Sequence, residues 1–220
     1  MVEITDIRII YKKLGKMKFV SHLDMNRFFT RMLRKTKLPI WYTEGFNKRV
    51  YVNFALPLSL GYESLYEVMD FRITQNTELS VIEEKLKEVL PESIVLIKAV
   101  YPKMKSKEIA SAVYNIKFYD VNLTESIKKL LEQEQLLTLK KTKKGIKEID
   151  LKPNILKYEV NKENGNTVLM LKLPAGNTLN INPSLITDII LKECADGSNN
   201  DICYSVTRTV LLNEKDEVFI

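Results

Sequence analysis

The sequence predicts an α+β protein made of two consecutive halves. Short segments in which apolar and polar residues alternate are typical of strands, and longer segments with apolar residues every three or four positions are typical of amphipathic helices. Both kinds of segment recur in a similar order after a polar stretch at residues 102–110 that has neither period. The 220 residues, 45% hydrophobic and 28% charged, suffice for one large domain or two small ones.

The first half is centred on a helix that is expected to begin at His22. Ser21 precedes it as an N-cap, and Asp24 follows three residues later as the partner in a capping box. Because a proline cannot continue a helix, Pro39 ends it. Apolar residues repeat at helical spacing on one face, which should pack on the core: Met25, Phe28, Phe29, Met32 and Leu33.

The other elements of the first half complete a βαββαβ unit. A second helix is expected at residues 79–90, and Pro91 closes it. Strands are expected at residues 6–12, 40–43, 51–54, 66–73 and 93–100. This order predicts a ferredoxin-like half, in which two helices cover one face of an antiparallel sheet.

The second half repeats this pattern with additions. Helices are expected at residues 124–133 and 183–194. Strands are expected at residues 113–121, 136–141, 146–151, 157–160, 168–173 and 202–212. We therefore expect tandem ferredoxin-like halves, residues 1–105 and 106–220, the second elaborated with extra hairpins.

Several classes of protein are disfavoured by composition. No apolar run approaches the roughly 20 residues that span a bilayer, and the first residues lack a secretory signal pattern, so a soluble, cytoplasmic protein is expected. Cys194 and Cys203 form no CxxC pair, and with the single histidine they match no standard zinc spacing. The sequence therefore predicts neither a metal nor a cofactor.

The positive charge is concentrated near the N-terminus. The whole chain has a net charge of +6, and residues 1–53 alone contain 12 Lys and Arg against 4 Asp and Glu. A local excess of this kind is typical of a surface that meets phosphate, although a basic face that only aids solubility is the simpler alternative.

Basic and aromatic residues interleave in this region as they do in single-strand RNA-binding surfaces. Three arginines share a second face of the first helix, and two further cations follow in the turn GFNKR, beside several aromatic residues. The candidate nucleic-acid-binding residues are Arg27, Arg31, Arg34, Lys48, Arg49 and Tyr42. The alternatives are structural: Arg27 can pair with Asp24, and aromatic residues in strands more often belong to a core.

His22 is the one candidate for catalysis. It stands beside Ser21 at a helix start, but neighbouring residues there point in different directions, so a capping serine and a packed or solvated histidine explain the pair more simply. We therefore expect no catalytic activity of the chain's own. A metal-independent, ribonuclease-like enzyme that uses His22 is the alternative.

The segment from Ser21 to Asp70 resembles the radical-SAM-linked family of unknown function. The resemblance depends on a Ser-His-Leu-Asp motif, an Arg-rich helix, a Gly-Phe-Asn turn and a Pro-Leu-x-Leu-Gly segment with a downstream Glu and Asp. The matching residues are Ser21, His22, Leu23, Asp24, Arg27, Arg31, Arg34, Leu38, Pro39, Gly45, Phe46, Asn47, Ala55, Pro57, Leu58, Leu60, Gly61, Ser64, Glu67 and Asp70. Where the family usually continues the turn with Pro-His-Pro, this chain has Lys48, Arg49 and Val50.

The resemblance implies an accessory protein that is encoded beside, or fused to, cobalamin-binding radical SAM enzymes. The chain lacks the three-cysteine motif of those enzymes and cannot hold their cluster. We therefore expect it to bind RNA or a ribonucleoprotein substrate for a radical SAM partner. A protein-only scaffold, whose basic face meets an acidic partner, is the remaining alternative. In element order alone the chain also resembles tandem ferredoxin-like endonucleases of CRISPR systems, but residues 177–220 lack their glycine-rich loop.

Overall fold

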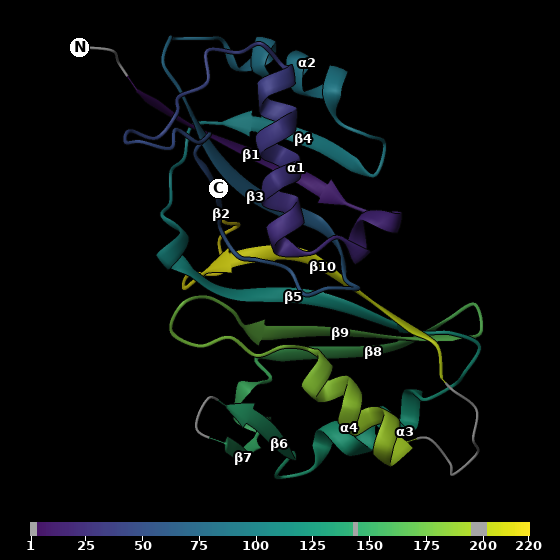
Figure 1. Cartoon of the computed structure of the whole chain (residues 1–220). Helices are drawn as coiled ribbons and strands as arrows, with labels where there is room; N and C mark the ends of the chain where they lie inside the picture. Colours follow the sequence, from purple (N-terminus) through teal and green to yellow (C-terminus); the bar gives the residue numbers. More distant parts are fainter. Residues whose placement is uncertain (1–3, 143–144, 195–201) are drawn as a thin grey trace. The chain divides into compact units, whose positions relative to one another are not determined.

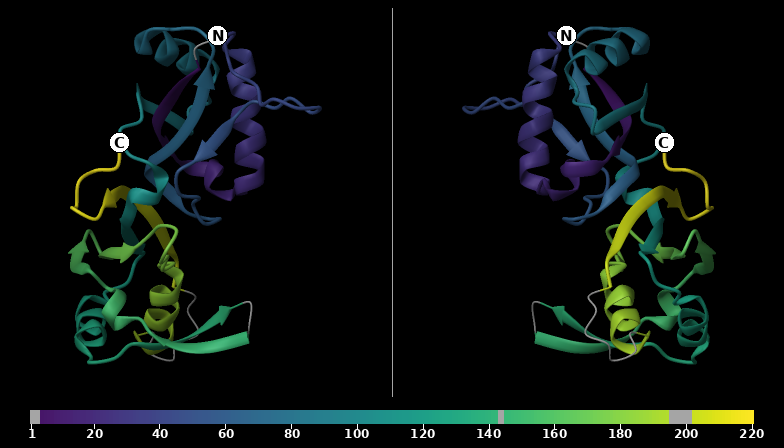
Figure 2. Two further views of the ribbon diagram at one scale, coloured as in Figure 1. Left: turned by 90° about the vertical axis from the view of Figure 1, so that its left-hand side faces the viewer. Right: turned by 90° about the vertical axis from the view of Figure 1, so that its right-hand side faces the viewer.

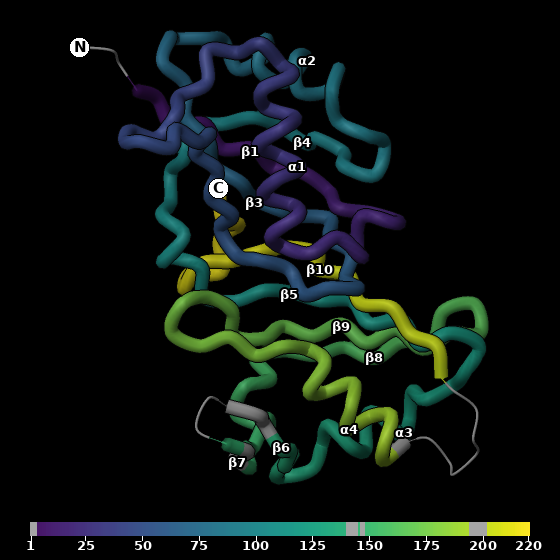
Figure 3. Tube along the Cα trace, viewed as in Figure 1, coloured from purple at the N-terminus to yellow at the C-terminus, as the bar shows by residue number. Residues whose placement is uncertain are grey.

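The computed structural model describes residues 4–142, 145–194 and 202–220. The chain forms two compact units, one made of residues up to Glu108 together with Val218–Ile220, the other of Ile109–Glu217. The sequence placed a boundary after residue 105, three residues before the division between these units. Figure 3 follows the chain from β4 (Ile94–Val100) through residues 101–108 into β5 (Ile109–Phe118).

The first unit has the element order β1-α1-β2-β3-α2-β4 (Figure 1). Its elements are β1 (Thr5–Lys13), α1 (His22–Lys35), β2 (Val52–Phe54), β3 (Glu63–Ile73), α2 (Leu79–Val89) and β4 (Ile94–Val100), with short 3-10 helices at Gly15–Phe19 and Ser106–Glu108. Within this unit the strands lie in the order β4-β1-β3-β2, and every neighbouring pair is antiparallel. Apart from the strand expected at residues 40–43, the order of helices and strands is the one that the sequence predicts.

α1 begins where its capping residues predict. The Ser21 hydroxyl oxygen accepts a hydrogen bond from the Asp24 backbone N–H at 3.2 Å, and the hydroxyl donates to the Asp24 carboxylate at 2.8 Å. The helix ends at Lys35, earlier than Pro39 requires. Thr36 donates its hydroxyl to the Leu33 carbonyl, and Lys37 has a positive φ of 58°, which reverses the chain before the proline is reached.

Both helices pack on one face of the first sheet. Met25, Phe29 and Leu33 of α1 are buried against the alternate β1 residues Ile7 and Ile9. Ile82 and Leu86 of α2 join the same cluster. Each such side chain contributes about 1.5–3 kcal/mol through burial, so this face dominates the stability of the unit.

The strand predicted at residues 40–43 is wrong. Only isolated bridges form there, Ile40 with Ile73 and Tyr42 with Val50. Trp41 still donates its backbone N–H to the Arg72 carbonyl at 2.8 Å, but Thr43 turns away to bond Arg49 instead of β3. The segment therefore leaves the sheet edge as a loop that extends past α1 (Figure 2).

A buried ion pair lies on the opposite face of the first sheet. Arg8 donates to both carboxylate oxygens of Asp70, at 2.7 and 2.8 Å, and to the Met104 carbonyl at 2.9 Å. The same guanidinium lies 4.5 Å from the ring centre of Phe219, whose carbonyl accepts a bond from Tyr66. These contacts explain why residues 218–220 belong to the first unit.

Within the second unit the strands lie in the order β10-β5-β9-β8, with antiparallel neighbours, and β6 and β7 form a separate hairpin. Its elements are β5 (Ile109–Phe118), α3 (Thr124–Glu132), β6 (Leu137–Thr142), β7 (Gly145–Asp150), a 3-10 helix (Lys152–Asn154), β8 (Lys157–Glu163), β9 (Asn166–Pro174), α4 (Ser184–Cys194) and β10 (Tyr204–Asn213). Of the extra hairpins that the sequence predicts, one corresponds to β6 and β7. Among the residues that the structure describes, no helix is long and apolar enough to cross a membrane.

Candidate nucleic-acid interface and the pocket beside it

The three arginines of α1 lie on its exposed face. Their spacing of three and four residues places Arg27, Arg31 and Arg34 on the side away from the buried Phe29 and Leu33. Arg27 and Arg34 are seven residues apart, so they are separated by about 10 Å along the helix axis. This row of guanidinium groups matches the row that the sequence predicts.

Arg27 differs from the other two because it has an acidic partner. Its guanidinium donates to Asp24 at 3.1 Å across one helical turn, and both side chains are exposed. The hydrogen bond from Ser21, followed by the bond from Arg27, holds the pKa of the Asp24 carboxyl below its ordinary value. The structural alternative that the sequence allowed for Arg27 is thus present, and its charge is partly neutralised.

Arg34 links the helix to the following loop. Its guanidinium carbon lies 5.9 Å from the ring centre of Tyr42, and Tyr42 keeps 39% of its surface exposed. The distance between these groups is that of a weak cation–π contact. An exposed aromatic ring and an exposed cation from different segments are therefore neighbours.

The loop of residues 42–50 carries the other predicted cations. Its two sides are joined by the bridge between Tyr42 and Val50 and by two bonds between Thr43 and Arg49. Lys48 and Arg49 are exposed on this loop. Arg34 thus contacts Tyr42, and Arg49 bonds the next residue, Thr43, whereas Arg27 lies two turns earlier on α1.

Two of the aromatic residues near this loop, Trp41 and Tyr51, already contact a cation of the chain. The Arg72 guanidinium lies 5.3 Å from the ring centre of Trp41 and 4.4 Å from that of Tyr51. Asp6 accepts a hydrogen bond from Arg72 at 2.7 Å, and this bond raises the pKa of the guanidinium above its ordinary value. Trp41 and Tyr51 therefore stack on a cation of the chain itself, which removes them as free base platforms.

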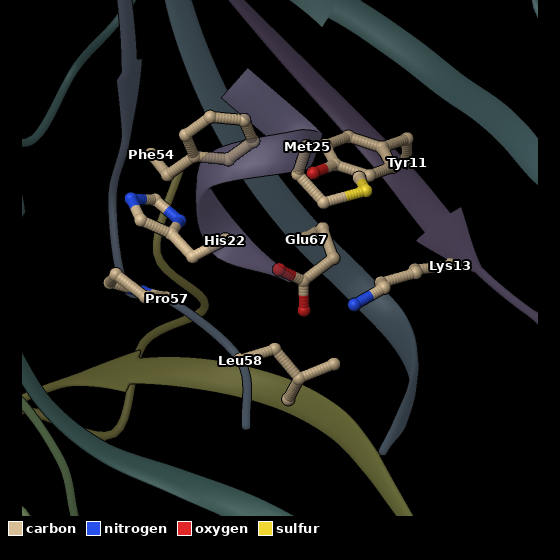
Figure 4. Close-up of a pocket in the computed structure, with 8 residues that line it drawn as sticks. All are labelled: Tyr11, Lys13, His22, Met25, Phe54, Pro57, Leu58 and Glu67. Carbon is tan, nitrogen blue, oxygen red and sulfur yellow. The ribbon is translucent and has the colours of Figure 1, made fainter. Parts of the chain in front are cut away.

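His22 lies at the edge of a small pocket beneath the start of α1. Its ring packs edge-on against Phe54, with ring centres 5.1 Å apart, and lies between Phe54 and Pro57 (Figure 4). The residues around the pocket are Tyr11, Lys13, His22, Met25, Phe54, Pro57, Leu58 and Glu67. The cavity of about 10 Å³ has room for about one water molecule.

Two buried charges line the same pocket. Lys13 is 3% exposed and Glu67 is 4% exposed, and in Figure 4 the ammonium and the carboxylate point toward each other. Lys13 also donates to the Val20 carbonyl at 3.3 Å. Buried titratable groups in a pocket are a general feature of sites that move protons or bind polar ligands, and of structural ion pairs.

Lys13 was missed from the sequence although a signal was present. Residues at positions 7, 9, 11 and 13 of a strand share one face, so burial of Ile7, Ile9 and Tyr11 implies burial of Lys13. Glu67 and Asp70 lie on opposite faces of β3, as their spacing predicts: Glu67 faces this pocket and Asp70 bonds Arg8. Among the described residues, no group of three or more His, Cys, Asp and Glu is placed to hold a metal ion.

The family model described as "Uncharacterized protein conserved in bacteria (DUF2344)" matches residues 6–183, which include α1, the loop and the pocket. The chain belongs to this family. No curated protein matches the DUF2344 chain.

Two solved structures have limited similarity to this DUF2344 protein. One is a chain of a Cbf5-Nop10-Gar1 complex, with 11% identity over 92% of the present chain and a TM-score of 0.46. The present chain spans 48% of that protein, about half its length. The other is an unknown protein from Galdieria sulphuraria, with 11% identity over 94% of this chain and all of that one, and a TM-score of 0.27. At these scores neither similarity assigns a function.

Proposed function

We propose that this DUF2344 protein is a binding module that holds single-stranded RNA, free or in a ribonucleoprotein, on a basic face of its first unit. The basic face consists of Arg31, Arg34, Lys48, Arg49 and Tyr42, with Arg27 at its rim. The observation that carries the proposal is the contact of the Arg34 guanidinium with the exposed ring of Tyr42 at 5.9 Å. It joins the cations of α1 to those of the loop beside a ring on which a base can stack.

The charges of this face are available to a ligand. Within the described parts of the chain, Arg31, Arg34, Lys48 and Arg49 have no acidic side chain within ion-pair distance, whereas Arg27 has Asp24. Guanidinium groups bond phosphate oxygens at two points, and unpaired cations along a helix suit a phosphate backbone. The concentration of net charge in residues 1–53 supports the same interpretation.

The partner and the architecture are proposed on other grounds. The motifs between Ser21 and Asp70 resemble a radical-SAM-linked family, so the RNA or ribonucleoprotein is proposed as the substrate of a cytoplasmic radical SAM enzyme that this chain assists. The strand orders β4-β1-β3-β2 and β10-β5-β9-β8 support a tandem ferredoxin-like arrangement with a hairpin inserted in the second half. A protein-only scaffold would use the same face against an acidic protein.

A second candidate function is favoured by the pocket. His22 lies at its edge, and Glu67 and Lys13 are buried in it, which is a set of groups able to accept and donate protons. A metal-independent, ribonuclease-like activity would use this set. The cavity has room for only about one water molecule, so RNA binding is the stronger proposal.

The deciding experiment is a titration of an unstructured 20-nucleotide RNA at several salt concentrations. If the basic face binds phosphates, log Kd should depend linearly on log salt, and the slope should shrink by about 0.7 in Arg31→Ala and again in Arg34→Ala. Lys85→Ala is the matched control, because Lys85 is a partly exposed helical cation of the same unit and is paired with Glu88. An absence of RNA affinity at low salt contradicts the proposal and leaves the protein scaffold.

A further inference from the structure

Phe46 is fully exposed, at 104% of its reference surface, the highest value of any large apolar side chain that the structure describes. It lies near the tip of the 42–50 loop, next to Gly45, whose φ of 113° permits the turn. The loop extends away from the sheet past α1 (Figure 2). A phenylalanine in this position contributes nothing to the folded core.

We propose that Phe46 stacks on an unpaired purine base of the bound strand, and that the 42–50 loop thereby selects single-stranded over duplex RNA. The inference depends on the proposed RNA-binding function and adds to it the structural class of the substrate and the residue that reads it. In a duplex the bases are already stacked on each other, so a ring from the loop would have to separate a base step.

The base of the loop that carries Phe46 is anchored. The bridge between Tyr42 and Val50 and the two bonds between Thr43 and Arg49 close its base, at 2.8 and 3.1 Å. The Tyr42 ring in turn contacts Arg34 of α1. Phe46 therefore lies at the tip of a loop whose base is anchored. Such a loop loses less conformational freedom when it binds a ligand than an unanchored segment does.

The surroundings of Phe46 suit nucleic acid better than a membrane or a protein pocket. Lys48 and Arg49 follow it by two and three residues and are exposed, so a phosphate backbone can be neutralised while a base stacks. Its other neighbours at the tip are the acidic Glu44 and the polar Asn47, which leaves one ring alone to enter a bilayer. A single ring followed by two cations matches the alternation of base and phosphate in one strand.

The base class follows from the chemistry of phenylalanine. The ring has no hydrogen-bond donor or acceptor, so it cannot read base edges, and its contact depends on stacked area. Purines have a larger face than pyrimidines. We therefore expect a preference for purine over pyrimidine strands without a fixed sequence.

The test uses a 12-nucleotide adenine-rich RNA with one 2-aminopurine, and the same strand in a duplex. The wild-type protein should change the fluorescence of the single strand and bind it more tightly than the duplex. Phe46→Ala should weaken single-strand binding about 5- to 150-fold, which corresponds to about 1–3 kcal/mol, with the salt slope unchanged. Phe46→Trp should restore binding, and Phe46→Leu, which is apolar but not aromatic, should not.

Leu60→Ala is the matched control, because Leu60 is also exposed and apolar but lies outside the loop. If wild-type RNA binding has the expected salt slope and Phe46→Ala binds equally well, the stacking inference is wrong while the proposed function stands. If the wild-type chain has no RNA affinity at low salt, the proposed function fails first. Phe46-dependent binding to phosphatidylserine vesicles, or to an acidic protein, with none to RNA overturns both.

Discussion

The guanidinium of Arg8 and the carboxylate of Asp70 form a two-point ion pair between directly paired residues of β1 and β3, with N–O distances of 2.7 and 2.8 Å. The Arg8 side chain is 1% exposed and that of Asp70 13%. The Arg8 guanidinium also donates to the Met104 carbonyl and packs over the ring of Phe219. Removing either partner leaves a buried charge without its counter-ion.

We expect Asp70→Ala to lower the free energy of unfolding by about 3–5 kcal/mol, because Arg8 stays buried and unpaired. The double variant Arg8→Met, Asp70→Leu should recover much of the loss, since it removes both charges and keeps apolar volume. Urea unfolding monitored by circular dichroism measures both. Equal stability of the wild type and Asp70→Ala would show that the pair is more hydrated than its burial indicates.

The capping group of α1 gives a prediction about pH. The pKa of Asp24 is held below its ordinary 3.8 by hydrogen bonds from Ser21 and then Arg27. A depressed folded-state pKa contributes stability above the unfolded-state value, and this contribution is lost as the pH falls through the folded-state pKa. Ser21→Ala and Arg27→Ala should each raise the Asp24 pKa, measured by NMR titration of its side chain.

The matched variant for this prediction is Asp24→Asn, whose amide oxygen can still accept from the Ser21 hydroxyl but whose side chain does not titrate in this range. Its stability should vary less with pH below about 4 than that of the wild type. An Asp24 pKa that is unchanged by Ser21→Ala would contradict the assignment of the serine hydroxyl as the larger cause.

The sequence was sufficient for the elements that local chemistry determines. Ser21 and Asp24 located the start of α1, and the spacing of Phe29 and Leu33 identified its buried face. Both signals depend on residues three or four positions apart, within one helical turn or the next. The same spacing placed Arg31 and Arg34 on the opposite, exposed face.

Contacts between distant segments could not be predicted in this way. The cation–π contacts of Arg72 with Trp41 and Tyr51 depend on where the later strand β3 lies beside them. The ion-pair partner of Asp70, Arg8, lies 62 residues earlier in the chain. The strand predicted at residues 40–43 failed for a related reason: its alternation was right, but its neighbours bond across the loop instead of along the sheet. Propensity does not say which partner a strand finds.

The stack on Arg72 predicts different roles for Tyr51, which is partly exposed, and Tyr42, which is exposed. Tyr51→Ala should lower stability, because it removes one face of the stack with Arg72, and should leave RNA affinity and its salt slope unchanged. Tyr42→Ala should cost about 1–3 kcal/mol in RNA affinity and little stability. Trp41 is the only tryptophan, so its fluorescence should report the loss of Arg72 in Arg72→Met. A large loss of RNA affinity in Tyr51→Ala would place bases on this stack instead.

The contact of His22 with Phe54 predicts that the imidazole acts through packing. The rings meet edge-on at 5.1 Å, an arrangement that contributes about 0.5–1.5 kcal/mol in aromatic pairs. His22→Phe should therefore keep the contact and the stability, while His22→Ala should lose up to that amount in thermal unfolding. Neither variant should alter RNA affinity, because His22 lies outside the basic face.

Incubation of labelled RNA with the wild type and with His22→Phe, analysed on a denaturing gel, completes the test. Cleavage by the wild type that disappears in both His22→Phe and Glu67→Gln would instead assign the pocket a role in proton transfer, since those substitutions remove the titratable groups and leave the arginines of α1 in place.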